Sequence, residues 1–247
     1  MRSIRLFYFF SLLLFGSYST AQANSHASAT PNQTISLAAL EFPPYSYTQT
    51  GSSECVGYII ELTRQIFSRE GYTLEAICAP AIRVYRMIEI GDIDLTVNIK
   101  STQLIQNKVE FIEPQYGQLE LIFLTHKNNG FANMVSGIRG FDYNGQRKEL
   151  VKRGFTFQDT PGSIDAIKMF IRGRTRHLIT YKAPYKFYLE QHGFSTPLEV
   201  DIENLTSIPT FYAVSVLSPQ KEAIKQILIR AAKDKNIERF EDLLAFY

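Results

Sequence analysis

The sequence predicts an α/β fold built on a parallel sheet with helical crossovers. Two observations carry this expectation: apolar strand patterns alternate with amphipathic helical patterns over residues 35–100, and the connections between them are short. Size is a third, because 247 residues with 45% hydrophobic content suffice for one large or two small domains. Ligands of such sheets bind beyond the carboxyl ends of the strands, where a site is therefore expected.

Residues 1–23 are expected to be a secretory signal peptide. Two arginines precede the apolar run "LFYFFSLLLFG", and the small residues Ala21 and Ala23 suit cleavage before Asn24. The run is shorter than the about 20 residues that a membrane span needs. An uncleaved N-terminal anchor is the alternative. Residues 24–34 are small and polar and predict a disordered lead-in.

Charge excludes two classes of partner. The sequence holds 26 basic and 24 acidic residues, and the signal segment contains Arg2, Arg5 and no acid, which leaves 24 of each after cleavage. Nucleic acid or an anionic membrane would call for a concentrated basic face, so neither is expected as a partner.

The two cysteines, Cys55 and Cys78, are expected to form a disulfide, because an exported chain meets an oxidising compartment. The closed loop would be worth roughly 3 kcal/mol on the chain-entropy model. Two free buried thiols are the alternative.

The first half of the chain predicts three strands and two helices. The strands are expected at residues 35–40, 72–78 and 93–99, and the helices at 57–71 and 81–91. Ile59, Leu62 and Ile66 stand at helical spacing, and Gly71 and Gly91 end the two helices.

The second half repeats this rhythm. Its strands are expected at residues 119–125, 177–181, 197–200 and 209–216, with a strand ending in a turn at 134–140 and a strand followed by a loop within 155–162. Its helices are expected at 143–154, 163–173, 183–193, 218–235 and 237–246. Ser218 is the expected N-cap of the fourth of these helices, with Pro219 at its first position.

The stretch "EIGDIDLTVNIKST" separates two kinds of polar residue. Asp92 lies in the turn before the strand at 93–99, and Asp94 lies near the start of that strand, where it can serve the backbone of the turn. Neither histidine nor further carboxylates stand nearby, so a metal role is not expected. Asn98, Ser101 and Thr102 emerge at the carboxyl end and are candidate ligand-binding residues.

Motifs for catalysis or cofactor binding do not occur in the sequence. The four histidines lack metal-ligand spacing, and neither a G-x-S-x-G, a Walker loop nor a G-x-G-x-x-G is present. The sequence therefore predicts no cofactor, no metal and no catalytic residue.

Two tyrosines and two arginines are candidate ligand-binding groups. Tyr45 and Tyr47, on the stiff "PPYSY" loop, combine flat faces with hydroxyls and suit a small organic ligand. Packing over the edge of the core is the alternative for both. Arg83 and Arg86 are three positions apart near a helix start, where either could clamp a carboxylate. A solvated pair on the helix face is the alternative.

Two strand ends in the second half could present backbone to a ligand. The loop from Thr160 to Ser163 enters a helix, and free N–H groups there favour an anionic group. Ser163 could instead be only the helix N-cap. Arg139 and Gly140 end another strand, where the glycine lets the backbone approach a ligand closely.

The order of these motifs resembles the family 3 periplasmic solute-binding proteins, whose best known members are amino-acid receptors of ABC transporters. The segments that carry the resemblance are "LEFPPYSYTQTG", "GYIIELTRQIFSREGY", "PAIRVYRMIEIGDIDLTVNIKST", "VEFIEPQYGQLELIFLT" and "SIDAIKMFIRGRTRHLITY". Together the likeness extends over nearly all of residues 35–247.

The resemblance implies a type II periplasmic-binding-protein fold, in which two crossing strands, here 119–125 and 209–216, join two α/β lobes. The first lobe would be residues 35–123 with 217–247, and the second residues 124–216. A small solute would be trapped between them by hinge closure. The implied protein is a periplasmic monomer that serves an inner-membrane ABC permease or a sensor.

Two departures from the family pattern concern the solute. Ile105 stands where the family has a carboxylate-clamping arginine, and Tyr181 and Lys182 stand near the place of an acid that holds an ammonium group. An amino-acid-like or carboxylate solute would then be held differently, by Arg83, Arg139 or Lys182, with tyrosines such as Tyr181 accepting an apolar or aromatic body. The alternatives are a dehydratase-like enzyme on the same scaffold and a secreted interaction module without ligand.

Overall fold

The computed structural model describes residues 33–127, 132–194 and 199–246. The expected signal peptide and residues 24–32 of the expected lead-in lie outside these ranges. Gln33 and Thr34 do not belong to a disordered lead-in, because they pair with the neighbouring strand and begin the first strand of the sheet.

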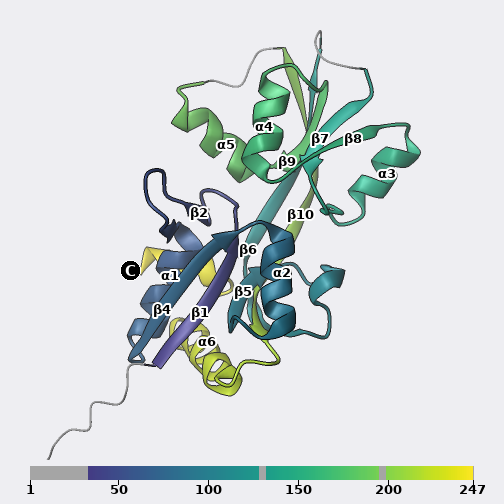
Figure 1. Ribbon diagram of the computed structural model, residues 1–247. Helices are drawn as coiled ribbons and strands as arrows, with labels where there is room; N and C mark the ends of the chain where they lie inside the picture. Colours follow the sequence, from purple (N-terminus) through teal and green to yellow (C-terminus); the bar gives the residue numbers. More distant parts are fainter. Residues whose placement is uncertain (1–32, 128–131, 195–198, 247) are drawn as a thin grey trace, which may run out of the picture. The chain divides into compact units, whose positions relative to one another are not determined.

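Eight strands form one sheet in the order β4-β1-β5-β10-β6-β9-β7-β8 (Figure 1). They are β1 Gln33–Leu40, β4 Tyr72–Ala79, β5 Leu95–Asn98, β6 Val109–His126, β7 Met134–Ile138, β8 Thr156–Thr160, β9 His177–Tyr181 and β10 Val200–Ser215. The short strands β2 (Tyr47–Thr48) and β3 (Cys55–Val56) form a separate hairpin.

Six α-helices and two 3₁₀ segments are present in the described residues. They are α1 Tyr58–Ser68, α2 Ala81–Ile90, α3 Gln146–Lys152, α4 Ser163–Ile171, α5 Lys182–Gln191, α6 Lys221–Lys235, η1 Gln103–Ile105 and η2 Phe240–Ala245. The helix expected at 237–246 is the shorter 3₁₀ segment η2.

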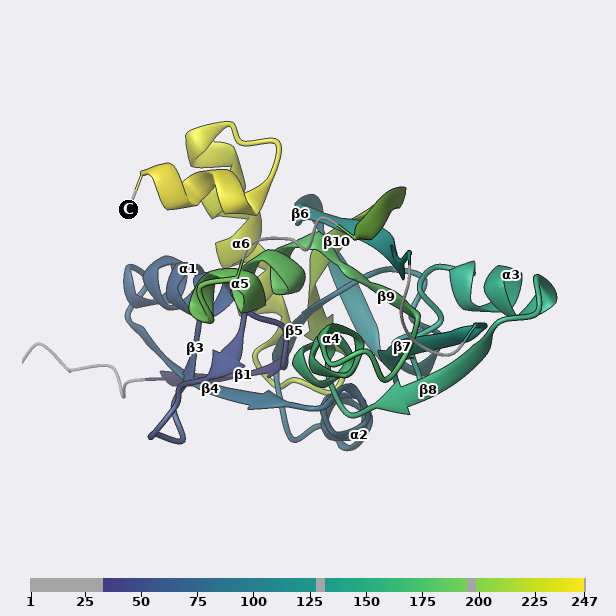
Figure 2. The same ribbon diagram turned by 90° about the horizontal axis from the view of Figure 1, so that it is seen from above.

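The sheet contains two groups of parallel strands. β1 pairs in parallel with β4 and β5, and β7 pairs in parallel with β8 and β9. Between the groups, β6 and β10 pair antiparallel with each other, and Figure 1 and Figure 2 show them side by side. β10 also pairs with β5, and β6 with β9, so these two strands connect the groups.

Both connecting strands extend beyond the predicted ranges. β6 has 18 residues and β10 has 16, because each pairs with the other from Val109↔Ser215 to His126↔Val200. The strand expected at 197–200 belongs to β10 at Val200, and its residues 197–198 lie outside the described ranges.

Apolar side chains fill separate cores around the two strand groups. Ile59, Leu62 and Ile66 of α1 pack with strand and α6 residues in one core, which confirms the predicted helical face. Phe170 of α4 and Tyr185 of α5 pack with β9 in another. Burial of this apolar surface, at about 25 cal/mol per Å², is the main stabilising term for each group.

Cys55 and Cys78 form the predicted disulfide, with their Cα atoms 5.1 Å apart. The bond connects β3 to the carboxyl end of β4 and so anchors the hairpin to the sheet. No helix within residues 33–127, 132–194 and 199–246 is both long and apolar enough to cross a membrane.

The amino end of β5 is held by a buried carboxylate. Asp94 is 8% exposed and accepts hydrogen bonds from the Ser36 backbone N–H at 2.9 Å, the Ser36 hydroxyl at 2.8 Å and the Ser218 hydroxyl at 2.6 Å. Ser218 is therefore not the N-cap of α6, whose N-cap is Gln220. The side chain of Asp94 connects β1 to the segment before α6, which is a wider role than the turn contact expected of it.

Candidate functional site

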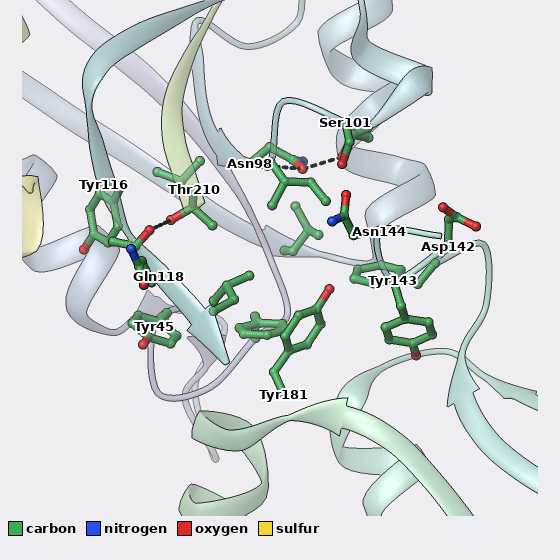
Figure 3. A pocket seen from close by; sticks show the side chains of 18 of the residues that line it. Tyr45, Asn98, Ser101, Tyr116, Gln118, Asp142, Tyr143, Asn144, Tyr181 and Thr210 are labelled. Carbon is green, nitrogen blue, oxygen red and sulfur yellow. Dashed lines mark hydrogen bonds between the residues drawn. The ribbon is translucent and has the colours of Figure 1, made fainter. Parts of the chain in front are cut away.

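A cavity of about 620 Å³ lies where the carboxyl ends of strands from both groups converge (Figure 3). Leu40 ends β1, Asn98 ends β5 and Tyr181 ends β9, and all three line it. Gln118 of β6 and Thr210 of β10 contribute from the connecting strands. Cavities of this size accept small organic molecules, for which typical volumes are about 300–1,000 Å³.

Aromatic rings form much of the cavity wall. Tyr45, Tyr116, Tyr143 and Tyr181 surround the space in Figure 3, and the hydroxyl of Tyr181 points into it. Further aromatic lining comes from Phe42, Tyr85 and Phe141. The ring of Phe42, which follows β1, meets the ring of Tyr181 edge-on at 5.0 Å between centroids, so rings from both strand groups touch at the cavity.

The tyrosines of the cavity are neutral phenols. Burial raises the pKa of Tyr45, Tyr85, Tyr116 and Tyr181 above its ordinary value. For Tyr45 and Tyr116 the carboxylate of Glu241 raises the pKa further. A neutral phenol can both donate and accept a hydrogen bond, which suits recognition of a polar group on a largely apolar solute.

Asn98 organises the polar part of the wall. Its side-chain oxygen accepts hydrogen bonds from the Thr102 hydroxyl and the Ile99 N–H, both at 2.8 Å, and its amide nitrogen donates to the Tyr85 hydroxyl at 3.4 Å. On β10, which pairs with β5, the Thr210 hydroxyl donates to the Gly117 carbonyl at 3.1 Å. These bonds fix the orientation of polar groups before any solute arrives.

Three charged residues line the cavity within the described part of the chain: Asp142, Lys148 and Glu241. Asp142 and Lys148 are exposed, whereas only 24% of the Glu241 side chain is exposed. Burial raises the pKa of Glu241 above its ordinary value, Asp242 adds to this, and Arg239, at 2.9 Å, opposes it. The Glu241 carboxylate lies directly over Gly117, where any Cβ atom would collide with it.

Six of the eleven candidate ligand-binding residues line this cavity and five do not. Those that line it are Tyr45, Asn98, Ser101, Thr102, Gly140 and Tyr181. Those that lie elsewhere are Tyr47, Arg83, Arg139, Thr160 and Ser163.

The candidate cationic groups are not among the described residues that line the cavity. Arg83 is exposed on α2, and Arg139 is exposed after β7, where its backbone N–H donates to the Thr160 carbonyl at 2.9 Å. Lys182 forms an ion pair with Glu120. No arginine occurs among the described residues that line the cavity. The cavity lining therefore gives no support to a clamp by Arg83 or Arg139. Lys182, together with Lys186, lines a smaller cavity of about 190 Å³ that shares Tyr45 and Tyr181 with the first one.

The remaining candidates are Tyr47, Thr160 and Ser163, which lie against other parts of the protein and outside the cavity lining. The ring of Tyr47 packs 5.3 Å from that of Phe187. The Thr160 hydroxyl lies within hydrogen-bonding distance of the Gly137 carbonyl, at 3.1 Å. Ser163 is the first residue of α4 and is buried, and because Gly162 is the N-cap, Ser163 does not have the capping role considered for it either.

Tyr143 and Asn144 line the cavity but were expected within a helix. Both have φ of 55°, and Gly145 follows with φ of 87°, so α3 begins only at Gln146. Asn-Gly pairs favour left-handed turn conformations, and this local signal could have located the turn. The other lining residues outside the prediction, including Gln118, Thr210 and Glu241, carry no comparable local signal.

Ile105 does not face the cavity. It stands where the family pattern has an arginine, but it is fully buried in a core with Val84 and Ile88 of α2. Its neighbour Leu104 lines the cavity instead. In the described segments no group of three or more His, Cys, Asp or Glu side chains is arranged to hold a metal ion.

A family profile matches this architecture. The profile of the bacterial extracellular solute-binding proteins, family 3, matches residues 36–242, and the chain belongs to that family. No curated protein sequence matches the chain significantly.

Solved structures share the fold at low sequence identity. An ancestral arginine-binding protein bound to arginine is 19% identical, with a TM-score of 0.68 over 87% of this chain and 97% of that one. A histidine kinase sensor domain similar to periplasmic binding proteins is 16% identical, with a TM-score of 0.68 over 87% and 96%. The ancestral amino-acid-binding protein AncCDT-1, a precursor of cyclohexadienyl dehydratase, is 16% identical, with a TM-score of 0.66 over 87% and 95%. The fold is thus the α/β type II periplasmic-binding-protein fold, with two lobes joined by two crossing strands, β6 and β10.

Proposed function

We propose that this protein captures a small organic solute in the 620 Å³ cavity and presents it to an inner-membrane ABC permease or to a sensor. The observation that carries the proposal is the position of the cavity, which is lined from both strand groups and from both crossing strands. A solute there would contact both lobes at once and would stabilise a closed arrangement by its differential affinity.

The lobes that we propose are residues 35–123 with 217–247, and residues 124–216. The strand pairings support a division within the crossing strands, because Phe211–Val214 of β10 pair with β5 and Leu121–Thr125 of β6 pair with β9. They favour limits somewhat earlier on each strand, before Leu121 and before Phe211. We propose the periplasm as the location, since the matching family is extracellular and the amino terminus has the pattern of a secretory signal.

The relatives suggest the kind of solute and the two possible receivers. One is bound to arginine and another to glutamine, and one is the sensor domain of a histidine kinase. The cavity of this chain departs from a carboxylate-binding site, because the described lining contains rings, amides and hydroxyls but no arginine. We propose a solute with an apolar or aromatic body, and binding rather than chemical conversion as the role.

A thermal-shift screen of the processed, unrefolded protein against a library of small metabolites tests the function. A bound solute raises the melting temperature by mass action, by an amount that grows with its concentration. Each compound that raises it would then be measured by titration calorimetry, and mass spectrometry after incubation would reveal any product. A library that leaves the melting temperature unchanged throughout would contradict the proposal.

A matched pair of variants localises the binding. Tyr181→Phe and Tyr47→Phe each remove one phenol hydroxyl, the first inside the cavity and the second outside it. We expect Tyr181→Phe to weaken binding by up to about tenfold, the usual range for one neutral hydrogen bond, and Tyr47→Phe to leave it unchanged. Equal effects of the two substitutions would place the solute elsewhere.

A further inference from the structure

We propose, on the basis of the function proposed above, that the solute is an organic cation: an amine with an apolar or aromatic body and no carboxylate group. Three features of the cavity support this assignment independently of the family. They are the ring-lined wall, the half-buried carboxylate of Glu241, and the composition of the charged lining.

The ring-lined wall favours a cation over an anion. An aromatic face carries partial negative charge and attracts an ammonium group within about 6 Å of the ring centroid, by about 0.5–2 kcal/mol per contact. Phe42, Tyr45 and Tyr181 gather on one side of the cavity, with centroids 6.2 Å apart for Phe42 and Tyr45 and 5.0 Å apart for Phe42 and Tyr181. The Tyr181 hydroxyl, which points into the cavity, can accept a hydrogen bond from an ammonium N–H.

Glu241 provides a negative charge at a sheltered position. Arg239 contacts both Glu241, at 2.9 Å, and Asp242, at 3.0 Å, so one cation is shared by two carboxylates and the group carries a net negative charge. The absence of a side chain at Gly117 is what allows the Glu241 carboxylate to lie against β6 beside the cavity. A cationic solute would supply the missing positive charge.

The other charged lining residues do not reverse this preference. Asp142 and Lys148 are both exposed and of opposite sign, so they leave the charge of the described lining at minus one. A solute carboxylate would face Glu241 and the aromatic rings, with the exposed Lys148 as the one cation of the described lining. Lys182 and Lys186 line only the smaller cavity that shares Tyr45 and Tyr181 with this one, and Lys182 is already paired with Glu120. Removing a carboxylate from water without a close partner costs several kcal/mol.

Two series of matched probes test the inference by titration calorimetry. The first is tyramine, tyrosine and 3-(4-hydroxyphenyl)propanoate, and the second is 2-phenylethylamine, phenylalanine and 3-phenylpropanoate. Within each series the members differ only in whether they carry the amine, both groups or the carboxylate at one end. We expect the amine member of at least one series to bind tenfold or more tightly than the other two members.

Glu241→Gln tests the role of the carboxylate, with Glu238→Gln as its control. Glu238 is exposed, lies three residues earlier and does not line the cavity, so its substitution removes the same charge from the same segment. We expect Glu241→Gln to lower the affinity for the amine tenfold or more and Glu238→Gln to change it less than twofold. The neutral probe 4-ethylphenol should bind both variants and the parent protein equally, which reports an intact cavity.

The outcomes separate this inference from the function on which it depends. If the amino acid or the carboxylate binds as tightly as the amine, or if Glu241→Gln leaves amine binding unchanged, the inference is wrong while solute binding stands. If none of the six probes binds, the inference is also wrong, and a positive compound in the metabolite library would still support the proposed function. Failure of both experiments would overturn both.

Discussion

The two ends of β5 carry polar residues that are similarly buried but have different roles. At the amino end, Asp94 is 8% exposed and accepts three hydrogen bonds from Ser36 and Ser218. At the carboxyl end, Asn98 is 7% exposed and lines the cavity while it holds Thr102 and Tyr85. The first end connects elements of the fold, and the second presents polar groups to the cavity in which we propose that the solute binds.

The difference follows from the direction of the chain in a parallel sheet. All strands of a parallel group end at the same edge, so loops that emerge there converge, whereas the opposite edge is closed by returning segments. Burial and polarity alone therefore do not identify a binding residue. Position relative to the cavity is more informative, because both side chains form three hydrogen bonds with the protein but, of the two, only Asn98 lines the cavity.

Asp94→Ala should have the largest effect of these substitutions, and the effect should be on the free energy of unfolding. It leaves the Ser36 N–H and the Ser218 hydroxyl without their shared acceptor, and bonds to a charged group are worth about 1.5–3 kcal/mol each before relaxation. We expect the free energy of unfolding to fall by about 3 kcal/mol in urea denaturation. Solute affinity of the remaining folded protein should stay within twofold of the parent value, and a large loss of affinity would erase the proposed division between the two ends.

Asn98→Ala should weaken solute binding strongly and lower the free energy of unfolding only moderately. The Thr102 hydroxyl and the Tyr85 hydroxyl lose a partner at the cavity wall, and we expect solute binding to weaken by about tenfold in titration calorimetry. The free energy of unfolding should fall by about 1–2 kcal/mol, less than for Asp94→Ala, since the lost bonds are neutral and the freed Thr102 and Tyr85 hydroxyls lie at the cavity, where water can replace the partner. A stability loss as large as that of Asp94→Ala, without a change in affinity, would argue for a structural role at both ends.

The smallest effect is expected for Arg83→Ala and Arg139→Ala. Both side chains are exposed and outside the cavity, so their removal should change solute affinity less than twofold and unfolding free energy within about 0.5 kcal/mol. Calorimetry of each variant with the best solute checks this. A tenfold loss for either variant would revive the earlier hypothesis of an arginine clamp and would require the lobes to close further around the solute.

Elements with a clear apolar period were predictable. The face of α1 formed by Ile59, Leu62 and Ile66 is buried as expected, and Gly91 ends α2 in the left-handed conformation. The disulfide between Cys55 and Cys78 was also expected, because export and an even cysteine count constrain it chemically. These features depend on the spacing of apolar residues, on the conformational freedom of a glycine or on the oxidising compartment to which the chain is exported. Each of these can be inferred from the sequence.

Features that depend on distant partners were not predictable. Ser218 resembles an N-cap locally but donates to Asp94, which lies 124 residues earlier. The first ten residues of β6 were not expected as a strand, and their pairing with the end of β10 requires contacts across about a hundred residues. Local preference for a cap or a loop is worth about 1 kcal/mol, which a well-formed long-range contact can exceed.

The sequence by itself determined the α/β alternation, the family, the disulfide and the strand ends at which Asn98, Thr102 and Tyr181 emerge. Only the tertiary structure decided that these residues share a cavity with Glu241, and that Arg83 and Arg139 face solvent. The physical reason is range: periodicity and turn chemistry act over a few residues, whereas the cavity is formed where two strand groups, separated along the chain, bring their carboxyl ends together.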